Sequence, residues 1–180
     1  MLNGEATNFI YSTNGGSSWS APTQVSLSGD RPLYAAPAIS PDGSRVYVVY
    51  EADTAPWAGA DFHSPRPYHG VFRSSAVGPT GAPTGWATEF NESPGDLLAT
   101  YPGHDLYQER VGDYVYAAAS NSYGVGVWTS AANAAVCPAV QAYRERSFAA
   151  GHRVLPGAPW PLQDCPPTFG NTDIQSISTA

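Results

Sequence analysis

Short runs of β-branched and aromatic residues recur along the chain, and each run is bounded by Gly, Pro, Asn, Asp or Ser. This pattern is typical of strands separated by turns. Apolar side chains nowhere keep the 3.6-residue spacing of an amphipathic helix over about ten residues, so we expect almost no helix. The predicted strands are 6–12, 23–27, 34–40, 45–51, 70–75, 86–90, 113–120, 124–129, 139–144 and 172–178. The sequence therefore predicts an all-β fold whose strands form an antiparallel meander.

Two predicted hairpins repeat the same order of side-chain sizes: a strand of small residues, a tight turn, then a strand of bulky residues. The units are 35–38, 40–43 and 46–50, and 117–120, 121–124 and 125–128. This order suits a β-propeller blade, in which the first strand is crowded around a central axis and the next packs between neighbouring blades. An Ala-rich strand in a β-sandwich is the alternative interpretation.

The chain has 180 residues and a formal net charge of −7, and all of its basic residues are arginines. An acidic chain without a basic cluster is a poor electrostatic match to nucleic acid or to anionic lipid. The longest apolar runs, such as 46–50, are far too short to cross a bilayer. We therefore expect neither a nucleic-acid partner nor a membrane partner.

The two cysteines, Cys137 and Cys165, both lie in Pro-containing loop sequence. A disulfide between them would stabilise the fold by about 3 to 4 kcal/mol in the chain-entropy model and would indicate an oxidising compartment. Two separate buried thiols are the alternative. We expect a secreted protein. Its export signal is expected to lie outside this chain, because residues 1–5 have neither the basic nor the apolar region of a signal peptide.

The most specific segment is 12–19, with the sequence Ser-Thr-Asn-Gly-Gly-Ser-Ser-Trp between two predicted strands. The side-chain carbonyl of Asn14 is placed to accept hydrogen bonds from turn amides, and Gly16 permits a positive φ. Trp19 is then expected to fold over the hairpin. The segment resembles the Asp-box, Ser-x-Asp-x-Gly-x-Thr-Trp, of the sialidase-like (BNR repeat) β-propellers. Ser12, Gly16 and Trp19 match that pattern, while Asn14 replaces the Asp and Ser18 the Thr.

The resemblance implies a single partial β-propeller domain over 1–180, a C-terminal fragment of a bacterial secreted protein. In this family the box joins the third and fourth strands of a four-stranded antiparallel blade. That register makes 6–27 the outer hairpin of one blade, 34–90 a second blade and 113–178 a third. Because sialidase folds are similar to propellers of about six blades, roughly half of the ring is missing. Missing blades or another chain are expected to cover the open edges.

The same register places the long connections on one face of the disc, which is therefore the expected binding surface. Its polar and aromatic residues are Asp30, Arg31, Asp53, Trp57, Asp61, His63, Arg66, His69, Glu92, Asp96, His104, Asp105, Glu109 and Arg110.

Catalytic candidates follow from the family. Sialidases resemble one another in holding a substrate carboxylate with arginines and in using a Tyr nucleophile beside a Glu. Arg31 and the cluster Glu109, Arg110, Asp113 and Tyr114 are the candidates here. The alternative interpretation is structural: Asp113 caps a turn, Tyr114 packs between blades, and Glu109 and Arg110 face solvent.

Other charged segments predict no site. Residues 143–146 alternate in charge on a predicted edge strand, which usually faces water. The histidines lack metal-ligand spacing and no Gly-rich phosphate loop is present, so we expect no metal and no cofactor.

Three functional hypotheses remain open. The chain is part of a glycan-directed, sialidase-type exo-glycosidase that is not catalytically complete by itself, or part of a non-catalytic binding or structural propeller. A β-sandwich or lectin-like jelly roll, with the box a coincidence, is the third.

Overall fold

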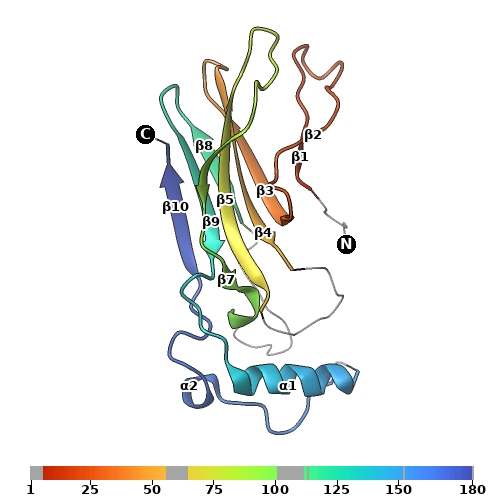
Figure 1. Ribbon diagram of the computed structural model, residues 1–180, viewed down its shortest axis with the longest axis vertical. Helices are drawn as coiled ribbons and strands as arrows, with labels where there is room; N and C mark the ends of the chain where they lie inside the picture. Colours follow the sequence, from red (N-terminus) through yellow and green to blue (C-terminus); the bar gives the residue numbers. More distant parts are fainter. Residues whose placement is uncertain (1–5, 56–64, 101–111, 113, 152, 180) are drawn as a thin grey trace.

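The computed structural model describes residues 6–55, 65–100, 112, 114–151 and 153–179, and it is mostly β (Figure 1). The elements are β1 (Asn8–Phe9), β2 (Thr23–Gln24), β3 (Arg31–Ile39), β4 (Arg45–Asp53), β5 (Pro67–Ala76), β6 (Ala87–Asn91), β7 (Gly95–Asp96), η1 (Leu97–Ala99), β8 (Tyr116–Ala119), β9 (Gly124–Ser130), α1 (Pro138–Ala149), α2 (Pro161–Asp164) and β10 (Asp173–Ser178). They form a β1–β2 hairpin, a central sheet in the order β3-β4-β5-β6 with β7 beside β5, and a sheet in the order β10-β9-β8. All the strand pairs within these sheets are antiparallel.

The central sheet is covered on both faces, so nearly every residue of β4 and β5 is buried. One face carries Val48, Tyr50 and Val71, which pack against Val25 and other residues that follow or flank the hairpin. The opposite face carries Tyr47, Val49 and Phe72, which pack against Trp128 of β9. The three sheets therefore lie in layers, with the central sheet between the hairpin and the β8–β10 sheet.

Glycines allow the two larger sheets to approach closely. A Cβ atom on Gly70 of β5 would overlap the indole of Trp128, and one on Gly126 of β9 would press on the ring of Phe72. Neither glycine has a positive φ, so their role is to leave room rather than to permit an unusual backbone.

The two Ala-rich strands, β3 and β8, are the first strands of their sheets and lie next to each other. Ala36, Ala117 and Ala119 pack against the aromatic cluster between the sheets. The turns that follow are also joined, because the backbone N–H of Asp42 donates to Asn121 Oδ1 (3.0 Å). The tips of the β1–β2, β3–β4, β5–β6 and β8–β9 hairpins all lie at one end of the molecule (Figure 1).

The predicted strand 139–144 is wrong, and the expectation of almost no helix fails with it, because these residues belong to the 12-residue helix α1. Pro138 occupies the first turn, where its missing N–H costs nothing. The buried positions, Val140, Tyr143, Arg144 and Ser147, have the i, i+3, i+4, i+7 spacing of one helix face. Two of the four are polar, which hid the stripe from the apolar pattern.

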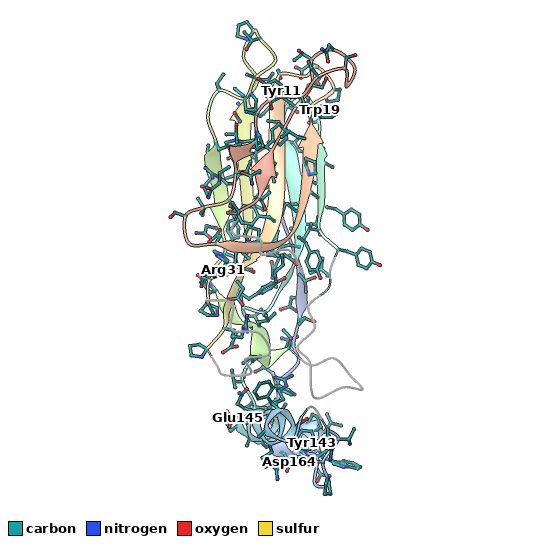
Figure 2. The ribbon with its side chains drawn as sticks, turned by 90° about the vertical axis from the view of Figure 1, so that its right-hand side faces the viewer. Tyr11, Trp19, Arg31, Tyr143, Glu145 and Asp164 are labelled. Carbon is teal, nitrogen blue, oxygen red and sulfur yellow. A yellow bond between two sulfur atoms is a disulfide. The ribbon has the colours of Figure 1, made fainter. Side chains whose placement is uncertain are left out.

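Residues 143–146 are consequently not on a solvated edge strand. Arg144 is 1% exposed and donates to the carbonyls of Leu98 (2.7 Å) and Thr100 (3.3 Å), which fixes α1 to the segment around η1. The predicted disulfide between Cys137 and Cys165 is present and joins the start of α1 to the end of α2. Figure 2 places Tyr143, Glu145 and Asp164 together at the end of the molecule opposite Tyr11 and Trp19. Neither of the helices described in the structure is long and apolar enough to cross a membrane.

The segment 12–19 forms the tip of the β1–β2 hairpin and is held by its own side chains. Ser12 Oγ accepts from the N–H of Gly16 (2.8 Å), and Asn14 Oδ1 accepts from the N–H of Ser18 (3.0 Å). Asn14 Nδ2 donates to Ser18 Oγ (2.8 Å), while Gly16 has a φ of 86°. Trp19 Cζ2 lies 3.8 Å from the Cβ position of Gly16, so its ring covers the turn.

Asn14→Ala should destabilise the hairpin by about 1 kcal/mol, because it removes both hydrogen bonds to Ser18. Asn14→Asp is the matched control and should keep full stability, since one carboxylate oxygen accepts from the Ser18 N–H and the other from its hydroxyl. Urea unfolding of the two variants measures this. Equal losses in Ala and Asp variants would show that the side-chain carbonyl does not hold the turn.

Candidate functional site

The candidate site is the end of the central sheet nearest the helices, where β4 ends and β5 begins (Figure 1). The expected surface residues that the structure describes are Asp30, Arg31, Asp53, Arg66, His69, Glu92 and Asp96. The others, together with Asp113, lie outside the described residues: Trp57, Asp61, His63, His104, Asp105, Glu109, Arg110 and Asp113.

The strands extend further into this region than the sequence predicts. Asp53 is the last residue of β4 and pairs with Tyr68 of β5, while His69 pairs with Ala52. Asp53 and His69 are 3% and 5% exposed, so they are buried strand residues and not members of an open loop. Charged residues are tolerated at such positions only when they are paired.

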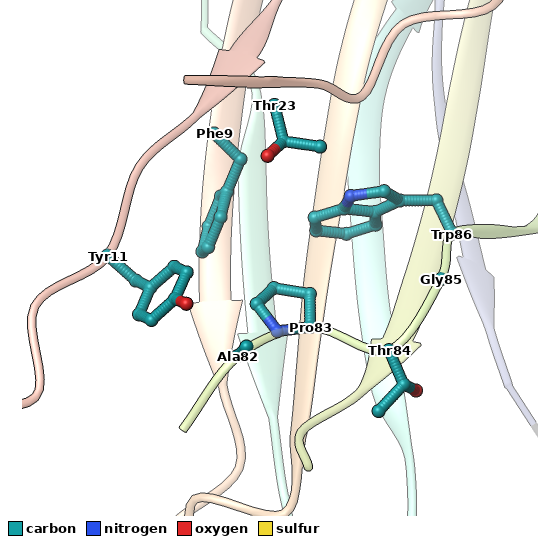
Figure 3. Close-up of a pocket in the computed structure, with 8 residues that line it drawn as sticks. All are labelled: Phe9, Tyr11, Thr23, Ala82, Pro83, Thr84, Gly85 and Trp86. Carbon is teal, nitrogen blue, oxygen red and sulfur yellow. The ribbon is translucent and has the colours of Figure 1, made fainter. Parts of the chain in front are cut away.

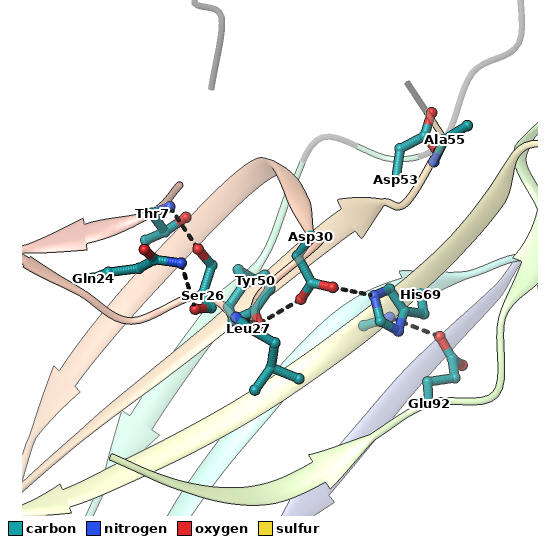
Figure 4. A network of polar contacts seen from close by, with 11 residues as sticks. Thr7, Gln24, Ser26, Leu27, Asp30, Tyr50, Asp53, Ala55, His69 and Glu92 are labelled. Carbon is teal, nitrogen blue, oxygen red and sulfur yellow. Dashed lines mark hydrogen bonds and ion pairs between the residues drawn. The ribbon is translucent and has the colours of Figure 1, made fainter. Parts of the chain in front are cut away.

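Asp30, Tyr50 and His69 form a buried hydrogen-bonded network (Figure 4). The Tyr50 hydroxyl donates to Asp30 Oδ2 (2.7 Å) and accepts from the N–H of Leu27 (2.9 Å). His69 Nε2 lies 3.3 Å from Asp30 Oδ1. The network ties the segment that enters β3 to the centre of β4 and β5.

The pKa values in this network move in opposite directions. Burial alone would raise the pKa of Asp30, but hydrogen bonds from His69 and Tyr50 outweigh it and hold that pKa below its ordinary value. Burial alone would lower the pKa of His69, but the hydrogen bond to Asp30 and the Asp30 charge raise it. Both shifts favour a charged pair, which therefore persists from weakly acidic pH to above the ordinary pKa of histidine.

A second buried pair lies between Arg66 and Asp53. Arg66 donates to Asp53 Oδ2 from Nη2 (2.6 Å) and from Nε (3.1 Å), and both side chains are less than a tenth exposed. The N–H groups of Arg66 (3.3 Å) and Leu98 (2.8 Å) donate to Asp96 Oδ1, which anchors the start of β5 beside η1.

Two buried glutamates join the central sheet to β9, and sequence reasoning missed the role of both. Glu92 Oε2 accepts from the Gly70 N–H (3.0 Å) and from Trp128 Nε1 (3.0 Å). Glu51 Oε1 accepts from the Thr129 N–H (2.8 Å) and Glu51 is fully buried. Burial raises the pKa of the neighbouring Tyr68 hydroxyl, and the negative charge of Glu51 raises it further. The signal for Glu51 was its place directly after the apolar run 46–50.

The two described catalytic candidates belong to neither charged pair. Arg31 is half-buried as the first residue of β3 and lies opposite Asp53 in the strand register. Tyr114 is 70% exposed and stacks on Tyr116, with ring centroids 6.5 Å apart and planes inclined by 6°. Tyr114 therefore does not pack between sheets, contrary to the structural interpretation of the sequence.

The chemistry of this end is dominated by pairing. Asp30, Asp53, Arg66, His69 and Glu92 all have protein partners, so a ligand would have to displace a buried interaction to reach them. Within the described ranges, no three His, Cys, Asp or Glu side chains gather as metal ligands would. The described part of this end is a stabilised scaffold.

No family model, no curated protein and no solved structure matches the chain.

Replacing His69 with Gln should destabilise the fold most at about pH 5 to 6, by up to about 3 kcal/mol, because one partner of a buried ion pair is lost. Since the folded-state pKa of His69 is raised, the wild-type advantage is full below the unfolded-state pKa. It should diminish as the pH rises through the folded-state pKa. Urea unfolding at pH values from 5 to 9 measures the difference.

Tyr50→Phe is the control, because it removes a hydrogen bond to Asp30 without removing a group that titrates near neutrality. Its cost should be constant from pH 5 to 9. A His69→Gln cost that is equally constant would disprove the charged pair.

Proposed function

We propose that this chain is part of an extracellular, glycan-directed β-propeller of the sialidase-like Asp-box type, and that its described part serves binding and scaffolding rather than catalysis. The observation that carries the proposal is the burial of both faces of β4 and β5 between a hairpin and a second sheet. A blade inside a propeller has neighbours on both faces in the same way.

The layers support the blade assignment segment by segment. The hairpin within 6–27 carries the box at its tip, the segment 34–90 supplies a four-stranded meander, and 113–178 supplies β8, β9 and β10. The Ala-rich first strands, β3 and β8, lie side by side, as strands around a common axis would. In this arrangement the exposed edges of the sheets are where further blades or another chain would pair.

The disulfide supports the extracellular part of the proposal. Cys137 and Cys165 are bonded, and disulfides of this structural kind persist in oxidising compartments.

The internal pairing of charges favours binding over catalysis. Asp53, Arg66 and His69, which the sequence placed on the functional face, are held in buried pairs. One observation favours a sialidase-type hydrolase as the second candidate: the exposure of the Tyr114 phenol beside the first strand of its sheet.

A glycan array probed with the protein, and a parallel assay with a fluorogenic sialoside, separate the two candidates. The proposal predicts binding to a subset of glycans without release of the fluorophore. Release that is lost in Tyr114→Phe but kept in the matched control Tyr116→Phe would instead establish the hydrolase. If the protein binds no glycan and releases no fluorophore, the glycan-directed function is contradicted in both forms.

A further inference from the structure

A hollow of about 270 Å³ lies on the outer side of the central sheet, between the β1–β2 hairpin and the connection from β5 to β6 (Figure 3). Its principal lining residues are Phe9, Tyr11, Thr23, Pro83, Thr84 and Trp86. It lies toward the hairpin tips and away from the buried charge pairs of the candidate site. It is slightly smaller than the roughly 300 Å³ at which drug-sized pockets begin, so it suits a single ring.

The walls of this hollow are fixed by the fold. Phe9 and Trp86 meet edge to face, with ring centroids 5.4 Å apart and planes at 70°. Arg73 donates to the carbonyl of Trp86 (2.7 Å) and to that of Val25, which joins the two sides of the hollow. A rigid site of this kind loses little conformational entropy when a ligand binds.

The connection from β5 to β6 is equally constrained. The N–H groups of Thr84 (3.1 Å) and Gly85 (3.2 Å) donate to Ser75 Oγ. A Cβ on Gly81, whose φ is 79°, would overlap the side chain of Thr13 in the box, so the two hairpin tips are in direct contact.

The chemistry of the lining is aromatic with hydroxyl groups and carries no charge. Figure 3 shows the Tyr11 ring beside Phe9, with its hydroxyl on the side of Pro83. Among the described residues, the Tyr11 hydroxyl has no protein partner. Thr23 is exposed and adds a second hydroxyl, whereas the Thr84 hydroxyl already donates to the carbonyl of Ala76 (3.2 Å).

We propose that this hollow binds one neutral pyranose ring of a glycan. The C–H face of a pyranose packs on aromatic rings, and its hydroxyls pair with those of Tyr11 and Thr23. The absence of charge in the lining disfavours an acidic sugar. A proline ring would also fit the aromatic wall, but it has no hydroxyls and would leave those of Tyr11 and Thr23 without a partner.

This inference adds a site to the proposed function and does not depend on it. A sugar bound here would contact the rim formed by two hairpin tips, far from the loops and helices at the opposite end.

Saturation-transfer NMR of the whole chain with the methyl glycosides of glucose, galactose, mannose and N-acetylglucosamine tests the proposal, with a polyproline peptide as the competing probe. At least one glycoside should bind, and Tyr11→Ala should weaken it about fivefold or more by removing an aromatic wall. Tyr11→Phe should weaken it about threefold, the effect of one hydrogen bond.

Tyr123→Ala is the matched control, because Tyr123 is a half-exposed tyrosine in the β8–β9 turn, outside this hollow. It should leave affinity unchanged. Folding of the Tyr11 variants is expected, since Tyr11 contributes only backbone groups to its hydrogen bonds with Ser20. Binding of the peptide but of no glycoside, or glycoside binding that Tyr11→Ala leaves intact, would overturn the proposal. If the glycan array shows no binding while a methyl glycoside still binds in this hollow, only the proposed function is contradicted.

Discussion

The indole of Trp128 lies directly on the backbone of Gly70, and this contact sets the distance between the two larger sheets. Trp128 is 1% exposed, and its N–H donates to Glu92, which also accepts from the N–H of Gly70. The Glu92 carboxylate therefore accepts hydrogen bonds from Trp128, which fills the space between the sheets, and from Gly70, which leaves room for the indole. Any side chain at position 70 would separate the layers.

The rest of the layered arrangement follows from that spacing. With the sheets this close, Phe72 reaches Gly126, Tyr47 stacks on Phe72 at 5.7 Å, and Glu51 reaches the Thr129 N–H. On the opposite face of β4 and β5, Asp30, Tyr50 and His69 perform the corresponding task with a polar network. Carboxylates thus hold both faces of the central sheet, and their function is to satisfy buried donors rather than to contact solvent.

The strands were predictable because local signals agree with the tertiary structure. Alternating β-branched and aromatic residues between Gly and Pro turns located β3 to β6 and β8 to β10, and the side-chain chemistry of Asn14 and Gly16 described the turn at 12–19. Helix α1 was not predictable from apolar spacing, because Arg144 and Ser147 occupy two of its four buried positions. Their burial depends on the carbonyl of Arg153 just beyond the helix and on those of Leu98 and Thr100, which are far from Arg144 in the sequence.

The same limit applies to the candidate site. The sequence alone does not show whether a charged residue near a predicted loop faces solvent or forms a buried pair. Asp53 and His69 are buried because the fold brings Arg66 and Asp30 beside them. The aromatic hollow was equally hidden, since Phe9, Tyr11 and Trp86 come from segments that only the packing of two hairpins brings together.

A double-mutant cycle measured by urea unfolding tests whether Trp128 requires a glycine at position 70. Gly70→Ala should cost about 2 kcal/mol or more in the wild-type chain, because the new methyl overlaps the indole. In a Trp128→Ala background, which lacks the whole indole, the same change should cost less than about 1 kcal/mol. An equal cost in both backgrounds would show that the Trp128 indole does not impose the glycine.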